Sequence, residues 1–512
     1  MKKTALEQEN IKLKKEVARH KDEVTRLQKE KEYLIEQFRL ALLRQFGKSS
    51  EKLVGQPDLP FADEEVPAIP ESPAEQEVAA HKRKTAGRKP LSENLPRTVH
   101  HHDLSEAEKV CSCGCQMQKI GEDITERLNV TPPRLWVDQH IRAKYACKHC
   151  QGLSDESKPA VRTAEGPVTL IPGSILSPQL LAFIWTNKFC DHLPFYRQEV
   201  GFERIGALVS RQDMSNWTQK VAENLEPLIK LLEEKIREGP VIQMDETPVK
   251  VLKLDHSGQD GQGYMWLALG DNGGRKVVRY WFAPGRASIH AREFLEAFTG
   301  YVQTDGYKAY ETAQKGGNWH HVGCWAHARR KLVEAEKITK SPMARDALGR
   351  IGKFYKLENN LHEAFKKGQL SAAEFLAQRQ QVVVPYLADF RQWMDEMLAK
   401  FLPEGELGKA FSYIQGQWDK LVRYVDHEGL TPDNNRAENA IRPFVVGRKN
   451  WLFHGNDRGA EASCRVFTLI ETAKLNGLEP YAYLSALLSA LPQVMKTGDW
   501  ESLLPWNLRG GN

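Results

Sequence analysis

Three acidic residues occupy positions where a carboxylate could do chemistry. Asp245 lies within a short apolar strand pattern, Val241–Leu252, Asp305 ends a second such pattern, and Glu438 lies in the helical stretch Asn434–Arg442. A carboxylate among apolar side chains is costly unless a cation meets it, and Mg²⁺ prefers oxygen ligands. Because three convergent carboxylates can hold two divalent ions roughly 4 Å apart, we expect a phosphoryl-transfer site with two Mg²⁺ or Mn²⁺ ions. A single Asp at a strand end is more commonly a turn or cap residue, so this prediction depends on all three acids.

Five of the eight cysteines crowd into residues 111 to 150. They form two groups, Cys111, Cys113 and Cys115, then Cys147 and Cys150. The Cys-x-x-Cys spacing of the second group is that of a zinc knuckle, and in a reducing compartment such clustering favours metal over disulfides. We therefore predict a zinc-ribbon-like module with one structural Zn²⁺, held by four of the five thiolates. Chance clustering is the alternative.

Cys324 and His327 lie one helical turn apart in a predicted helix. At that spacing they could bind a metal ion. A packed pair without a metal is the preferred interpretation, because buried cysteine commonly behaves as a small apolar residue.

Side chains of the types that contact DNA occur in four segments. They are a basic arm at 81–90, a predicted helix-turn-helix at 194–217 whose second helix Ser210 would cap, a strand and basic helix at 320–331, and the surroundings of Glu438. Arg and Lys neutralise phosphates, Gln and Asn can also reach base edges, and Trp can stack on a base. The candidate DNA-contacting residues are Arg88, Lys89, Arg211, Gln212, Asn216, Arg329, Arg330, Lys331, Arg436, Arg442, Arg448, Lys449 and Trp451. A solvated charge run and a helical hairpin that does not bind DNA are the alternatives for the first two segments.

Composition sets the broad class. The 512 residues are 41% hydrophobic and 27% charged, enough for several cores. The net charge of +5 is only mildly basic, so local patches must carry any prediction of DNA binding. No apolar run reaches the roughly 20 residues that span a bilayer, and the charged N-terminus does not resemble a signal peptide. We expect a cytoplasmic protein with no membrane partner.

Two N-terminal segments favour assembly and flexibility. Leu6, Leu13, Leu27 and Leu34 are spaced by sevens or their multiples, which indicates a coiled coil and self-association. A lone solvated helix is the alternative. Residues 55–80 are acidic and rich in proline, which is typical of a flexible linker.

The acids need a scaffold, and the strand patterns after residue 239 predict one. Three strands, a helix and a fourth strand ending in Asp305 follow the order of an RNase H-like core, and a wholly helical insertion separates this part from Glu438. The predicted fold is therefore a multidomain α+β protein with an RNase H-like α/β catalytic core. The predicted segments are a coiled coil at 1–53, a linker with the basic arm at 54–100, the zinc-ribbon-like module at 101–160, a helical DNA-binding region at 170–238, the first part of the core at 239–333, the helical insertion at 334–428, the catalytic Glu helix at 429–475 and a C-terminal helical region at 476–512.

Several long motifs, in order along the chain, resemble the large transposase of bacterial insertion sequences of the insertion-sequence sixty-six family. They are Arg44–Leu53, Gly87–Leu91, the cysteine module with Ile120–Glu122, Leu193–Glu199, Met244–Thr247, Thr304–Tyr307, Cys324–Lys331, Asn434–Pro443 and Gly447–Phe453. One departure concerns the first knuckle, which usually reads Cys-x-x-Cys in that family but here reads Cys-x-Cys-Gly-Cys.

The resemblance implies a DDE transposase with Asp245, Asp305 and Glu438 as its metal-binding triad. It also implies cooperation with two smaller proteins of the same element, and a bacterial, nucleoid-associated location. Such an enzyme cleaves DNA strands at the ends of the element and joins them to target DNA. A hydrolytic nuclease on the same fold that never joins strands, and a DNA-binding protein without enzymatic activity, are the alternatives.

Overall fold

The computed structural model describes part of the chain, which divides into two compact units. One unit is Met1–Glu65 with Lys144–Asn512, and the other is Val66–Ala143. The described residues are 13–24, 26–28, 30–31, 34–35, 91–92, 95–106, 108–109, 112, 115–130, 133–146, 161–254, 261–400 and 403–508. Of the helices in these ranges, none is both long and apolar enough to cross a membrane.

The described residues between 13 and 35 are helical. Leu13, Val17, Val24, Leu27 and Leu34 are apolar heptad positions, and each is more than half exposed. This helix therefore presents the apolar stripe that the sequence predicts, on a surface that a partner helix could cover.

Four helices precede the sheet, in the region that the sequence predicts to be helical. They are α2 (Pro178–Phe189), α3 (Phe195–Arg204), α4 (Arg211–Asn224) and α5 (Glu226–Arg237). Ser210 caps α4 by accepting a hydrogen bond from the Asp213 amide, which confirms that prediction. Gly206 supplies the positive φ of +87° in the turn between α3 and α4. The buried Trp185 indole donates to Thr218 Oγ1 at 3.0 Å, which ties α2 to α4.

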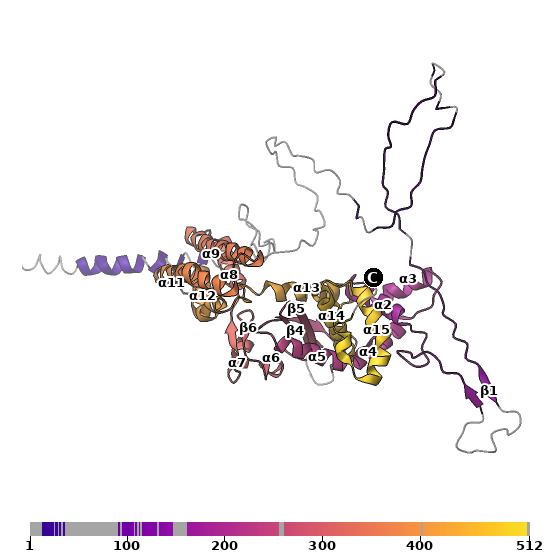
Figure 1. Ribbon diagram of the computed structural model, residues 1–512. Coiled ribbons are helices and arrows are strands. Elements are labelled where there is room, and N and C mark those ends of the chain that lie inside the picture. Colours follow the sequence, from indigo (N-terminus) through magenta and orange to yellow (C-terminus); the bar gives the residue numbers. More distant parts are fainter. Residues whose placement is uncertain are drawn as a thin grey trace, which may run out of the picture. The chain divides into compact units, whose positions relative to one another are not determined.

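A five-stranded mixed sheet follows (Figure 1). Its strands are β3 (Val241–Lys250), β4 (Gln262–Asn272), β5 (Arg275–Ala283), β6 (Tyr301–Gln303) and β7 (His320–Val322), in the spatial order β5-β4-β3-β6-β7. β3, β4 and β5 pair antiparallel, whereas β6 pairs parallel to β3 and β7 parallel to β6. The short helices α6 (Ser288–Leu295) and α7 (Lys308–Gln314) connect β5 to β6 and β6 to β7. A separate hairpin pairs β1 (Lys144–Ala146) with β2 (Val161–Thr163).

Helices from the end of the chain complete the sheet's core. They are α13 (Asn435–Trp451), α14 (Asp457–Leu475), α15 (Pro480–Thr497) and the 3₁₀ turn Trp500–Leu503. α14 lies against edge strand β5, where the Tyr280 amide donates to Thr468 Oγ1 (3.0 Å) and the Val278 amide to Thr472 Oγ1 (3.2 Å). Two amides at the sheet edge thereby gain acceptors, so α14 closes an edge that would otherwise offer free hydrogen-bonding groups.

The segment predicted as a helical insertion, 334–428, is helical, and together with α8 (Trp325–Thr339), which leads into it from the sheet, it packs around a second hydrophobic core. The elements that follow α8 are α9 (Pro342–Lys366), α10 (Ala372–Gln378), the π-helical turn Arg379–Val383, α11 (Val384–Leu398), α12 (Glu406–Val422) and the 3₁₀ turn Arg423–Asp426. The fully buried Arg379 donates to Glu358 Oε2 at 3.0 Å and to the Leu430 carbonyl at 2.9 Å. Gly323, just after β7, donates its amide to the Lys420 carbonyl of α12 at 2.9 Å, which joins the insertion to the sheet. The architecture is thus a mixed α+β protein that is mostly helical.

Candidate active site

The register of the two central parallel strands brings Asp245 and Asp305 together. Gln243 on β3 pairs with Gln303 on β6. Each aspartate lies two residues beyond its glutamine, so the two occupy equivalent positions on neighbouring parallel chains. Because residues i and i+2 of an extended chain point to the same side, the pairing of Gln243 with Gln303 also places the two carboxylates on the same side of the sheet. The Tyr307 amide donates to Asp305 Oδ1 at 2.9 Å and fixes that carboxylate.

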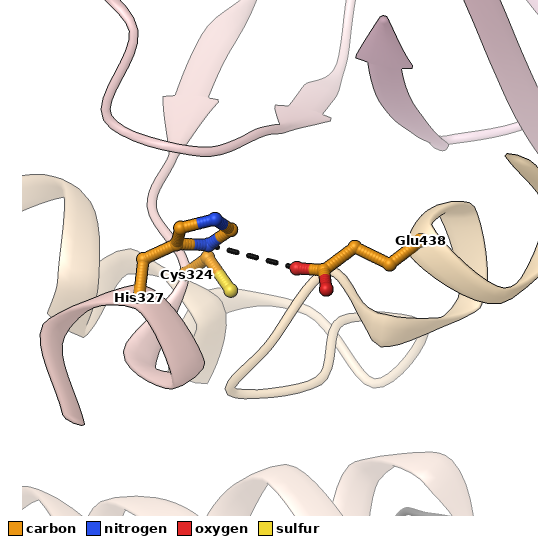
Figure 2. A group of neighbouring side chains, drawn as sticks. All are labelled: Cys324, His327 and Glu438. Atoms are coloured by element: carbon orange, nitrogen blue, oxygen red, sulfur yellow. Dashed lines mark ion pairs between the residues drawn. The ribbon is translucent and has the colours of Figure 1, made fainter. Parts of the chain in front are cut away.

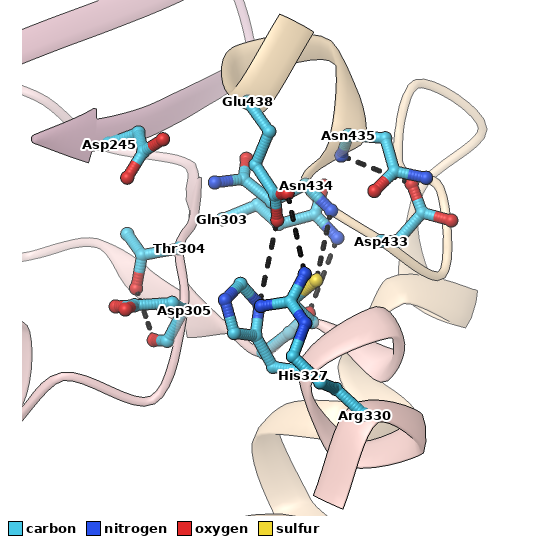
Figure 3. A network of polar contacts seen from close by, with 12 residues as sticks. Asp245, Gln303, Thr304, Asp305, His327, Arg330, Asp433, Asn434, Asn435 and Glu438 are labelled. Atoms are coloured by element: carbon cyan, nitrogen blue, oxygen red, sulfur yellow. Dashed lines mark hydrogen bonds and ion pairs between the residues drawn. The ribbon is translucent and has the colours of Figure 1, made fainter. Parts of the chain in front are cut away.

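Glu438 reaches the same region from the first turn of α13. The Asn434 side chain, at the start of this helix, donates to the Met244 carbonyl on β3 at 2.8 Å. This bond fixes the start of the helix beside the strand that carries Asp245. Figure 3 shows the three carboxylates around one space between β3, the end of β6 and the start of α13.

The charges in this space are not balanced. Burial and the negative charges of Glu246, Glu438 and Asp305 raise the pKa of Asp245 to about 8. One oxygen of Glu438, Oε1, is buried and has no hydrogen-bond partner. Oxygen ligands with excess negative charge suit a hard divalent cation, which would favour the ionised carboxylates. The residues therefore fit the Mg²⁺ or Mn²⁺ that the sequence predicts.

Glu246 is acidic too, but its two oxygens have partners. The Arg286 Nε donates to Glu246 Oε1 at 2.7 Å, and the Tyr310 hydroxyl donates to the other oxygen. The Arg286 guanidinium also lies over the Tyr307 ring, 3.7 Å from its centroid. The only sign of this network in the sequence is a second acid beside Asp245, which the alternation of side chains along a strand places on the other face of β3.

The side chain of Glu438 meets α8. His327 Nδ1 lies 3.6 Å from Glu438 Oε1, and a terminal nitrogen of Arg330 lies 3.9 Å from Oε2. The Cys324 sulfur accepts a hydrogen bond from the Asn434 amide at 3.3 Å, and burial raises the pKa of this thiol. Cys324 is buried as the packed-pair interpretation requires. His327, however, faces Glu438 (Figure 2).

Comparison with known proteins places this architecture in a family. A family model described as "Transposase IS66 family" matches residues 173–462, more than half of the chain. The chain belongs to the IS66 transposase family. Three further models match other segments: "Transposase C of IS166 homeodomain" at 33–99, "zinc-finger binding domain of transposase IS66" at 108–151 and "IS66 C-terminal element" at 468–506.

Similar proteins over most of their length occur in Sinorhizobium fredii (strain NBRC 101917 / NGR234). The chain is 31% identical to the "Uncharacterized protein y4qI", over 91% of this chain and 87% of that protein. It is 29% identical to the "Uncharacterized protein y4jD", over 86% and 87%, and 28% identical to the "Uncharacterized protein y4hP", over 93% and 88%.

Most of the predicted DNA-contacting residues that the structure describes in this transposase are at least partly exposed. Arg211, Gln212 and Asn216 are exposed near the start of α4, Lys331 is exposed on α8, and Arg436, Arg442 and Lys449 are exposed on α13, whereas Arg329, Arg330 and Arg448 are half-buried. Arg448 donates to Thr247 Oγ1 at 2.8 Å and to the Pro248 carbonyl, so it also ties α13 to β3. Arg436 lies 3.6 Å from Asp271 Oδ2.

The prediction that Trp451 stacks on DNA is wrong. Only 8% of Trp451 is exposed, and its ring meets Phe189, Phe444 and Phe467 at centroid distances of 6.3, 6.4 and 6.2 Å. Lys188 Nζ lies 4.7 Å from the Trp451 ring centroid. An indole held in this core has no free face for a base, so Trp451 anchors the end of α13 instead.

Several predicted residues fall outside the described part of the transposase. They are Arg88, Lys89, Cys111, Cys113, Cys147 and Cys150. Of the predicted zinc ligands, Cys115 is described and is exposed.

Proposed function

We propose that this IS66-family chain is a DDE transposase, with Asp245, Asp305 and Glu438 as its catalytic triad on an RNase H-like core. The observation that carries the proposal is the shared register of Asp245 and Asp305 on β3 and after β6, with Glu438 facing them from α13. The strand order β5-β4-β3-β6-β7, with three antiparallel strands followed by two parallel ones, supports the RNase H-like assignment. The helical insertion before Glu438 supports it as well.

The proposed reaction has two phosphoryl transfers in one site. In the first, a water oxygen bonds to phosphorus at the element's end, the bond to the 3′-oxygen breaks, and that oxygen takes a proton to become a free 3′-hydroxyl. In the second, this hydroxyl loses its proton and attacks a phosphodiester of target DNA, and the target's own 3′-oxygen leaves. No covalent bond to the protein forms in either step.

The chain's own residues orient the reacting groups. The Tyr307 amide fixes Asp305, Asn434 fixes the start of the Glu438 helix, and Arg330 lies beside Glu438. Two divalent cations held by the three acids would polarise the phosphate and favour an ionised attacking oxygen. The exposed basic residues of α4, α8 and α13 would hold the DNA backbone through its phosphates.

The remaining modules would serve assembly and DNA capture. Four of Cys111, Cys113, Cys115, Cys147 and Cys150 would hold one structural Zn²⁺. The exposed heptad stripe of the N-terminal helix would pair with a second copy, and the arm with Arg88 and Lys89 would bind DNA. Two smaller proteins of the same element would assist, in the cytoplasm and at the nucleoid.

The deciding experiment is cleavage of labelled DNA carrying the element's end, with Mg²⁺ or Mn²⁺ and with the companion proteins added. Glu438→Gln should lower the cleavage rate by at least about 100-fold, because it removes a charge that binds the metal at the reacting phosphate. Glu396→Gln, the same change at an exposed site on α11, should leave the rate unchanged. Full activity of Glu438→Gln would refute the triad.

Joining is tested separately. Pre-cut ends are incubated with a plasmid target, and joined products are counted. A transposase joins them, whereas a hydrolytic nuclease on the same fold cuts and never joins. Binding without cleavage or joining, with companions present, would leave a DNA-binding protein.

A further inference from the structure

The beginning of α8 brings two ligands of a different chemical kind to Glu438. Cys324 is the residue just before this helix and His327 lies in its first turn, and both face the first turn of α13. The Cys324 sulfur, a His327 nitrogen and a Glu438 oxygen all lie within 4.8 Å of one another. We propose that Cys324, His327 and Glu438 form a binding site for a transition-metal ion of the zinc class.

The choice of ion follows from the ligand set. Mg²⁺ seeks six oxygen ligands and is a poor match for a thiolate and an imidazole. Zn²⁺ and Co²⁺ accept sulfur, nitrogen and carboxylate oxygen together. Three protein ligands leave a fourth tetrahedral position for water or for an oxygen of the DNA.

The distances are close to what such an ion requires. Two ligands at about 2.0–2.1 Å from a tetrahedral zinc lie roughly 3.4 Å apart. His327 Nδ1 and Glu438 Oε1 are 3.6 Å apart. That separation is too long for a good hydrogen bond, but it nearly spans a tetrahedral edge.

The same two atoms lack other partners. His327 Nδ1 and Glu438 Oε1 are both buried without a hydrogen bond, and buried polar atoms are normally satisfied. Arg330 approaches the other oxygen of Glu438, Oε2, which leaves Oε1 for the ion. The Asn434 amide, 3.3 Å from the Cys324 sulfur, donates toward it as amides do toward metal-bound thiolates.

Binding at this site does not depend on the proposed reaction, but its consequence does. Because Glu438 is also a member of the proposed triad, an ion held with Cys324 and His327 would withdraw it from Mg²⁺. Micromolar Zn²⁺ should therefore inhibit DNA cleavage, and added Mg²⁺ should relieve the inhibition.

The test titrates Co²⁺ into the full-length protein and follows the thiolate-to-cobalt absorption band and the number of ions bound per chain. Cys324→Ser and His327→Gln should each lose one bound ion relative to wild type. The cysteine module is intact in every variant, so the difference isolates this site. Cys190→Ser and His320→Gln, which change the same residue types elsewhere, should keep the wild-type number.

Wild-type stoichiometry in both Cys324→Ser and His327→Gln would overturn the proposal. Because serine at the buried position 324 could destabilise the fold, His327→Gln, at a half-buried position, serves as the second variant. The metal site and the proposed reaction are tested by different variants. If Cys324→Ser and His327→Gln bind as much Co²⁺ as wild type while Glu438→Gln loses cleavage, the new site is refuted and the triad stands. If both variants lose an ion while Glu438→Gln still cleaves DNA, the site stands and the triad is refuted.

Discussion

The Asp245 carboxyl is largely buried and close to three other acids, Glu246, Glu438 and Asp305. Arg286 and Tyr310 donate hydrogen bonds to the neighbouring Glu246, yet burial and the negative charges of Glu246, Glu438 and Asp305 raise the pKa of Asp245 to about 8. A carboxyl whose pKa is raised in the folded state costs stability as the pH rises toward that pKa, because folding then opposes its ionisation. The candidate site therefore trades stability for a position that attracts a cation.

We predict that Asp245→Asn raises the thermal unfolding midpoint by a few degrees at pH 8 without added divalent ions, because it removes an unbalanced buried charge. Added Mg²⁺ should raise the wild-type midpoint more than that of the variant, since only the wild type keeps all three acids. Differential scanning fluorimetry measures both effects, with the exposed Asp389→Asn as control. A lower midpoint for Asp245→Asn in the absence of Mg²⁺ would contradict this account.

His454 gives a prediction of opposite sign. It is buried and stacks on Phe444 at 6.4 Å between ring centroids, and burial lowers its pKa to about 3. The folded protein keeps this ring neutral, while the unfolded chain takes up a proton below about pH 6.5. Stability from the neutral ring is thus complete above pH 6.5 and is lost as the pH falls toward 3.

His454→Gln should therefore gain stability relative to wild type by about 1.4 kcal/mol per pH unit as the pH falls from 6 to 4. Urea unfolding at several pH values gives this difference directly. Comparing variant with wild type cancels the titration of the buried acids, which changes stability in the opposite direction. His320→Gln, at an exposed position, should show no such trend; an equal trend in both variants would remove His454 as the cause.

At the scale of elements, α14 stabilises the sheet by accepting hydrogen bonds from its edge. Thr468→Val keeps the shape of the side chain but leaves the Tyr280 amide without its acceptor. An unsatisfied buried amide costs about 1–3 kcal/mol, so we expect that loss in unfolding free energy and faster amide exchange in β5. Thr468→Ser keeps the hydroxyl and should retain slow exchange at Tyr280. Equal exchange in the Val and Ser variants would show that the hydroxyl is not the acceptor.

The sequence predicted the elements that local pattern determines and missed contacts that depend on distant packing. The strands before Asp245 and Asp305 are short apolar runs, and the Ser210 cap follows from residue type alone. The residues next to Trp451 in the sequence do not determine whether its ring faces DNA or the core. Its burial depends on Phe189 and Phe467, which come from other helices. The approach of His327 to Glu438 likewise requires the packing of two helices separated by the whole insertion.

At the scale of the whole molecule, the proposed reaction acts on an element that has two ends, and the N-terminal helix offers a way to pair two chains. Leu27 and Leu34 lie on its exposed apolar stripe, and burying both against a second copy would favour association.

Leu27→Lys with Leu34→Lys places like charges in that seam, so we expect a smaller species in sedimentation velocity. Asp22→Lys reverses a charge on the outer face of the same helix, away from the stripe, and should leave the wild-type mass. Cleavage of single labelled ends should survive in the double variant while paired-end joining falls, because each chain keeps its own acids. An unchanged mass in the double variant would show that the stripe pairs with something other than a second copy.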